Sequence, residues 1–196
     1  VKNCNNFGTI NYTPNNSVGY INCCGGIIGE SNAFSKNNIF ENCTNYGDIL
    51  ADLTSETISA VDIGGICGAG NINQLNQITN YGNIISNSSG DILICAGWIC
   101  GSTYCHNEND VYNYGDLTFK NVKQIVKTTS NNTFLNVGVL FAQGDSMYIH
   151  ENIGNEGNII VNGNIYRAHI GGLFQNLYSD STITNAYNTG NISVID

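Results

Sequence analysis

The hydrophobic positions of this chain recur at fixed spacing around an Asn and a Gly. Each copy of this first unit reads apolar-x-Asn-x-Gly-x-apolar, as in residues 4–10 and 43–49. Six copies occur, and their glycines are Gly8, Gly47, Gly82, Gly115, Gly157 and Gly190. The two end positions of the unit are apolar in every copy, so we expect both side chains to point into a core.

A second unit, a Gly-rich step followed by two apolar residues, lies between successive copies of the first. Its five copies start at Gly25, Gly64, Ala96, Gly138 and Gly171. The apolar runs are short and rich in β-branched residues, without helical periodicity, and the chain has one Pro. These features predict an all-β fold, a parallel β-solenoid (β-helix) that forms a single repeat domain over residues 1–196.

The motif glycines are 39, 35, 33, 42 and 33 residues apart, which indicates about six irregular repeats of about 33–42 residues. One coil per repeat is favoured over two coils of half that length, because one coil places like residues above like. We expect the motif Gly to provide either a positive φ or a close approach of two backbones. Stacked motif Asn side chains can form a hydrogen-bonded ladder.

Four consecutive copies carry an aromatic residue between the motif Asn and the motif Gly. These residues are Phe7, Tyr46, Tyr81 and Tyr114. Stacking one coil on the next turns them into a row of rings, which stabilises neighbouring coils. The same row could instead serve as a platform for glycans or for another chain.

The second unit ends in two consecutive hydrophobic residues. Adjacent residues of a strand point to opposite faces of the sheet, so both cannot face the core. One of the two sets is therefore expected to face outward as an apolar stripe that a partner covers. The candidate stripe for self-association consists of Ile27, Ile66, Trp98, Leu140 and Leu173.

The best-formed copy reads STITNAYNTGNI over residues 181–192 and follows the Gly-Gly step at Gly171. It resembles the GLUG-motif family of microbial surface proteins, in which a Gly-Gly-apolar step alternates with an Asn-x-Tyr-x-x-Gly-x-apolar step. The resemblance implies an extracellular β-helical stalk or adhesin segment, and it transfers no catalytic residue. The eight cysteines and the abundance of Asn, which fills 34 of 196 positions, depart from the family pattern.

Charge narrows the set of partners. The chain has 6 Lys plus Arg against 15 Asp plus Glu, a net charge of −9, which disfavours binding to nucleic acid or to anionic membranes. No apolar run is long enough for a membrane-spanning helix. The expected partners are the chain itself and, as an alternative, glycans.

No residue pattern specifies a catalytic site, a metal or a cofactor. Asp48 and Asp116 share the slot after the motif Gly, but Asn83 separates them in the stack, so they do not form a carboxylate pair. The oxygen-rich residues 107–110 are expected to be solvated rather than to bind calcium. The cysteines occupy slots that are apolar elsewhere, which favours buried thiols, while the even count leaves disulfides open.

Six N-glycosylation motifs occur, about the number that the Asn content produces by chance, and those that lie between units are at Asn11, Asn15, Asn87 and Asn131. We expect a non-enzymatic extracellular or cell-surface protein, either a stalk segment or a subunit that stacks end to end, because neither end shows an evident polar cap. An adhesin or carbohydrate-binding module is the alternative, and a glycan-cleaving β-helix is the expectation from the enzyme class.

Overall fold

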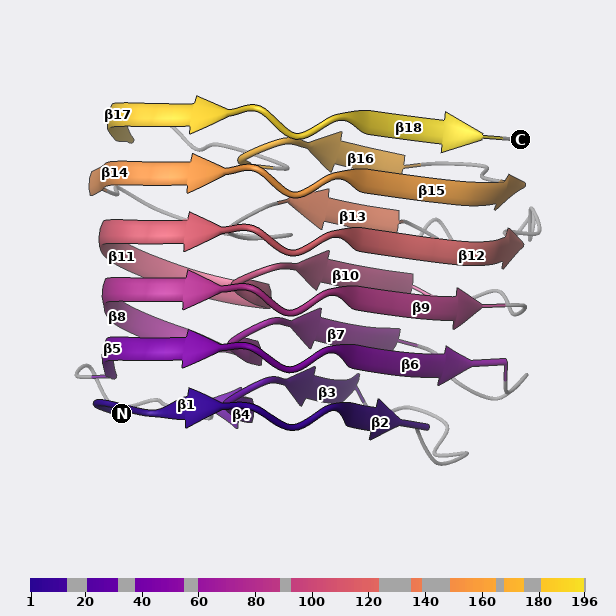
Figure 1. Cartoon of the computed structure of the whole chain (residues 1–196), viewed down its shortest axis with the longest axis horizontal. Coiled ribbons are helices and arrows are strands. Elements are labelled where there is room, and N and C mark those ends of the chain that lie inside the picture. Colours follow the sequence, from indigo (N-terminus) through magenta and orange to yellow (C-terminus); the bar gives the residue numbers. More distant parts are fainter. Residues whose placement is uncertain are drawn as a thin grey trace.

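The computed structural model describes residues 1–13, 21–31, 38–54, 60–88, 93–123, 135–138, 149–164, 168–174 and 181–195. These residues form strands and turns and no helix. The strands stack in parallel along one axis, with the two termini at opposite ends of the stack (Figure 1). The expected all-β parallel solenoid is confirmed.

Three parallel sheets make up the solenoid. The first sheet contains β1 (Asn5–Asn6), β4 (Ile28–Ser31), β5 (Ile39–Asn45), β8 (Cys67–Asn80), β11 (Cys100–Asn113), β14 (Ile149–Asn155) and β17 (Thr182–Asn188). The second contains β2 (Ile10–Tyr12), β6 (Ile49–Leu53), β9 (Ile84–Ser88), β12 (Leu117–Lys123), β15 (Ile159–Asn164) and β18 (Ile192–Ile195). The third contains β3 (Ile21–Gly25), β7 (Ala60–Gly64), β10 (Leu93–Gly97), β13 (Leu135–Gly138) and β16 (Ala168–Gly171).

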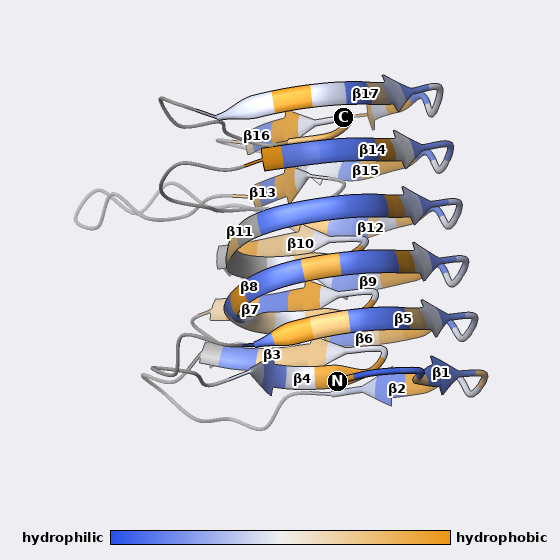
Figure 2. Ribbon diagram, turned by 90° about the vertical axis from the view of Figure 1, so that its left-hand side faces the viewer, coloured by the Kyte–Doolittle hydropathy of each residue, from blue (hydrophilic) through white to orange (hydrophobic). Residues whose placement is uncertain are grey.

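Each repeat forms one coil, as the spacing favoured. Asn45 of β5 pairs with Asn80 of β8, and Asn80 pairs with Asn113 of β11, so equivalent motif residues lie directly above one another. The side view shows the same stacking, with long hydrophilic stretches in β8, β11 and β14 of the first sheet (Figure 2).

The core lies between the three sheets and is built from columns of like residues. In the first sheet Cys43, Ile78, Val111 and Ile153 are fully buried. In the second sheet Ile49, Ile84, Leu117 and Ile159 are buried in the same way. Both end positions of the repeat unit therefore point inward in the inner coils, as predicted.

The motif glycine serves a close approach between coils. A Cβ built on Gly82 would lie 2.0 Å from the carbonyl oxygen of Gly47, and one built on Gly115 would lie 2.1 Å from that of Gly82. Positive φ angles occur among the described glycines at Gly70 and Gly163, outside the motif. Of the two roles expected for the motif Gly, the structure thus selects backbone contact.

The left-handed backbone conformation lies elsewhere, three residues before the motif Asn. The φ angles there are between 52° and 56°, and the column is made of Asn3, Asn42, Gln77, Asp110, Asn152 and Asn185. Small polar side chains, Asn above all, tolerate this region best, which explains five of the six residues. The strand registers of the first sheet skip this column from β5 to β17.

Candidate functional site

A continuous ladder of side-chain amides, buried in the inner coils, runs through the corner between the first and second sheets. Its members, called here the asparagine ladder, are Asn6, Asn45, Asn80, Asn113, Asn155 and Asn188. Each Nδ2 donates to Oδ1 of the next Asn at 2.6–2.8 Å. Each also donates to the carbonyl of the motif Gly two residues later. Burial without loss of hydrogen bonds is the condition for such polar groups in a core.

The asparagine ladder is polar along the solenoid axis, because every amide donates toward the C-terminal end. At the N-terminal end, Asn6 Oδ1 accepts from the Gly8 amide at 3.2 Å. An inner member, Asn155, accepts both from Gly157 and from the preceding Asn113. The first coil of the described chain therefore offers an acceptor, and Asn188 in the last coil offers a donor.

A second ladder runs beside it on the outer side of the motif Gly. Asp48 Oδ1 accepts from both nitrogens of Asn83 at 2.8 and 3.1 Å, and Asn83 Oδ1 accepts from the Asp116 amide at 2.9 Å. Asp116 in turn accepts from Asn158. Asn83 separates the two carboxylates, as expected, and they are bound in a structural ladder rather than paired for acid–base chemistry.

The four aromatic residues form one stack at the same corner, called here the aromatic row. Successive ring centroids lie 4.9, 5.2 and 4.9 Å apart, with interplanar angles of 4°, 5° and 10°. Phe7 is 74% exposed, and Tyr46, Tyr81 and Tyr114 are 48%, 47% and 39% exposed. The predicted row thus exists, and its rings present their edges to solvent while their faces cover one another.

The aromatic row ends where Glu156 takes the next position. The Glu156 carboxylate accepts a hydrogen bond from the Tyr187 hydroxyl at 3.3 Å. Burial, followed by the charges of the neighbouring side chains, raises the pKa of Tyr114 and that of Tyr187. Phe7, at the N-terminal end, stacks on one neighbour and is the most exposed ring of the row.

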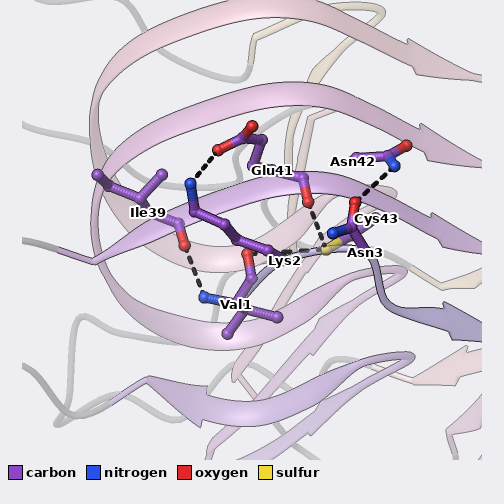
Figure 3. A network of polar contacts seen from close by, with 7 residues as sticks. All are labelled: Val1, Lys2, Asn3, Ile39, Glu41, Asn42 and Cys43. Carbon is purple, nitrogen blue, oxygen red and sulfur yellow. Dashed lines mark hydrogen bonds and ion pairs between the residues drawn. The ribbon is translucent and has the colours of Figure 1, made fainter.

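Among the described residues, no strand pairs with the outer edges of β1 and β2 at one end of the stack or of β17 and β18 at the other. Every residue of β17 and β18 is exposed, among them Ile192 and Val194, whose register partners Ile159 and Val161 are buried. At the other end the first residues of the chain lie on the second coil. There Lys2 forms an ion pair with Glu41, and Asn42 donates to Asn3 Oδ1 at 2.8 Å (Figure 3).

The expected outward apolar stripe is not formed. Ile66 and Trp98 are fully buried, and Ile27 and Leu173 are half-buried. The reason is that the described members of the stripe lie in a bend rather than in a strand, so the alternation of faces does not apply to Ile27, Ile66, Trp98 and Leu173. The prediction is therefore wrong for Ile66 and Trp98, and Leu140 lies outside the described residues.

The register of the second unit also differs from the expected alignment. Gly97 pairs with Gly64, so Ile99, not Trp98, lies above Ile66, whose amide donates to the Ile99 carbonyl at 3.0 Å. Trp98 occupies the position of Gly65 in the coil below. The sequence alone does not show whether Gly97 corresponds to the first or the second Gly of Gly64-Gly65. The structure aligns it with the first.

A buried acid–base pair, which we did not predict, lies in the core of the first sheet. Glu108 and His150 are register partners, 2.9 Å apart between Oε2 and Nδ1, with side chains 0% and 3% exposed. Burial raises the pKa of Glu108, and the hydrogen bond and charge of His150 oppose that rise. Burial also raises the pKa of the adjacent Cys105 thiol well above its usual value. The position of these residues in the repeat could have indicated their burial. Glu108 and His150 each lie five residues before a motif Asn, and other coils have Phe40 and Leu75 at this position.

The eight cysteines are free thiols. Six are buried, and Cys4 and Cys23 are half-buried, in agreement with the apolar interpretation. Burial raises the pKa of Cys23 and of Cys95 to about 12, so these thiols stay protonated and weakly nucleophilic. Among the described residues, no group of three or more His, Cys, Asp or Glu side chains is arranged to hold a metal ion.

The candidate glycosylation positions differ in how exposed they are. Asn11 is exposed in β2, and Asn87 is half-buried and accepts a hydrogen bond from Asn121 at 2.9 Å. Asn15 and Asn131 lie outside the described residues. Within the described chain, no helix has the length and hydropathy needed to cross a bilayer.

Searches with protein-family models, against curated proteins and against solved structures found no match for this chain. The fold therefore defines a class, the parallel β-solenoids, and no family is assigned.

Proposed function

We propose that this chain is a non-enzymatic structural protein whose solenoid lengthens by end-to-end stacking into a filament or a stalk. The observation that carries the proposal is the polarity of the asparagine ladder, which ends in an acceptor at Asn6 and a donor at Asn188. Stacking the last coil of one copy on the first coil of the next would continue the ladder without a break. A head-to-head contact would place two acceptors against each other.

The strand edges support the same arrangement. An exposed edge carries unpaired N–H and C=O groups that another strand can satisfy. In a head-to-tail contact β1 of the next copy would add to β17, and β2 would add to β18, in the parallel sense found throughout the stack. The contact would also cover Ile192 and Val194 of β18, whose register partners in the coil below are buried.

An extracellular or cell-surface location is part of the proposal. It is supported by the resemblance of residues 181–192 to GLUG-type surface repeats and by an outer surface solvated by amides rather than by charges. The absence of catalysis is likewise proposed, because Asp48 and Asp116 are engaged in a structural ladder.

Electron microscopy of the purified chain over a range of concentrations tests the proposal. We expect filaments whose axial repeat is six coils of about 4.8 Å each. The variant Val194→Lys places a charge on the inward face of β18 and should abolish the filaments. Its neighbour Ser193→Lys changes the opposite face of the same strand and should leave them intact. Single short rods at every concentration, with the fold intact by circular dichroism, would refute stacking.

Carbohydrate binding by the aromatic row is the lower-ranked proposal. Sugars stack on the faces of aromatic rings, and Phe7, a terminal ring with one stacking partner, is the most exposed ring of the row. Glycan binding by the wild type that is lost in Phe7→Ala and retained in Tyr81→Phe would favour this role over assembly.

A further inference from the structure

The aromatic row holds three exposed phenols in an arrangement that no structural role requires. Rings alone suffice for stacking, as Phe7 shows at the first position. Tyr46, Tyr81 and Tyr114 add hydroxyl groups, and their rings remain 39–48% exposed. An outer surface of the solenoid therefore presents consecutive phenols that a small oxidant can reach.

The backbone fixes the spacing of these phenols. The amide of Tyr81 donates to the Asn45 carbonyl at 2.7 Å, and that of Tyr114 donates to the Asn80 carbonyl at 2.8 Å. The centroids of Tyr46 and Tyr81 lie 5.2 Å apart, and those of Tyr81 and Tyr114 lie 4.9 Å apart. Holding two reactants at contact distance raises their effective concentration by orders of magnitude.

We propose that Tyr46, Tyr81 and Tyr114 form a site of oxidative tyrosine coupling that links consecutive coils covalently. The oxidant is a peroxide, acting through a peroxidase. Two phenols each lose one electron and one proton, and the resulting phenoxyl radicals join through a carbon–carbon bond between their ortho positions. The two ortho hydrogens then move to the oxygens as the rings regain aromaticity, and one hydrogen peroxide is reduced to two waters.

The proposed coupling takes place within one chain, because the row of rings ends at Tyr114. Beyond Tyr114 the next two positions hold Glu156 and Thr189, so a stacked second copy would bring Thr189, not a phenol, next to Phe7. Covalent bonds therefore fasten coils within one chain, whether or not copies stack. This inference depends only on the stacked coils and is independent of the proposed assembly.

The test treats the purified chain with hydrogen peroxide and a peroxidase and then cleaves it after glutamate. Glu56 and Glu108 separate Tyr46, Tyr81 and Tyr114 into three peptides. We expect dityrosine fluorescence, a protein that remains a monomer on a denaturing gel, and linked peptides that join Tyr46 to Tyr81 or Tyr81 to Tyr114.

Tyr81→Phe is the decisive variant, because it keeps the ring stack and removes the phenol common to both couplings. It should lose both linked peptides, whereas Tyr187→Phe, which alters an exposed tyrosine outside the row, should retain them. Links formed mainly between chains, or linked peptides that persist in Tyr81→Phe, would overturn the proposal. Equal coupling of the row in the unfolded chain would overturn it as well.

Discussion

The side-chain amide of Asn80 donates to Oδ1 of Asn113 at 2.8 Å, although 33 residues separate the two in the chain. Both side chains are fully buried. The same amide also donates to the Gly82 carbonyl in its own coil, so a single side chain closes a turn and binds two coils together. Repetition of this contact in every coil explains why Asn, a poor core residue, is invariant in this slot.

Removal of one member of the asparagine ladder should lower the free energy of unfolding substantially. Asn80→Ala leaves the Gly82 carbonyl, Asn45 Nδ2 and Asn113 Oδ1 each short of a buried partner, and each such loss costs about 1–3 kcal/mol. We expect the free energy of unfolding to fall by about 3 kcal/mol or more. Urea denaturation measures it, with the exposed Asn162→Ala in β15 as the control, expected to change stability by less than about 0.5 kcal/mol. A small effect at Asn80 would mean that water can replace the rung.

The motif Gly lies against the backbone of the preceding coil in the inner coils but has open space beside it in the first coil. The cost of adding a side chain can therefore be compared between the two places. An alanine Cβ at Gly82 would lie 2.0 Å from the Gly47 carbonyl oxygen, whereas one at Gly8 meets its nearest atom at 3.8 Å. Gly82→Ala must push two coils apart and should cost at least about 2 kcal/mol, while Gly8→Ala should be close to neutral. Thermal unfolding of both variants decides whether close approach, rather than a special φ, selects Gly here. Equal destabilisation by both would contradict the close-approach explanation.

The repeat pattern was sufficient to predict the fold, because in a solenoid the sequence period is the structural period. Alignment on the motif Asn placed Cys43, Ile78 and Val111 in one inward column, and they are buried there. It also brought Tyr46 and Tyr81 into contact in a row that the structure reproduces.

The failures arose where local geometry breaks strand alternation. Ile66 and Trp98 were expected to lie on an outward stripe, but a bend directs both into the core. The Glu108–His150 pair was missed because residues 107–110 look like a solvated acidic segment when considered alone. The environment of Glu108 is set by His150, 42 residues away, and becomes visible only when the coils are placed in register.

The Glu108–His150 pair provides a test of whether a buried, hydrogen-bonded acid–base pair stabilises this core. Its column reads Phe40, Leu75, Glu108, His150 and Ile183. Breaking a buried pair by removing one partner costs about 3–5 kcal/mol, whereas apolar replacement of both is often neutral or stabilising. We therefore expect Glu108→Leu and His150→Leu to be strongly destabilising alone.

The double variant Glu108→Leu/His150→Leu should be within about 1 kcal/mol of the wild type or more stable. Chemical denaturation of the four proteins closes the thermodynamic cycle. Additive losses in the double variant would show that the pair contributes more than an apolar column can, for example by fixing the register of the two coils.

Asp62 should make the free energy of unfolding depend on pH up to about pH 7, which is higher than the range in which a carboxyl group usually titrates. Asp62 is 6% exposed between its register partners Cys23 and Cys95, and burial raises its pKa from 3.8 to about 7. Between these two values the folded chain binds more protons than the unfolded chain, so the contribution of Asp62 to stability is full below pH 4 and is lost as the pH rises to about 7.

The variant Asp62→Asn keeps the size and hydrogen-bonding capacity of the side chain and removes the proton equilibrium. It should match the wild type near pH 4 and exceed it above pH 7, by on the order of 2–4 kcal/mol. Unfolding free energies measured across this range give the difference directly. A wild-type profile that is flat between pH 4 and 7 would mean that Asp62 ionises with its normal affinity for protons, and that the polar column around it is open to water.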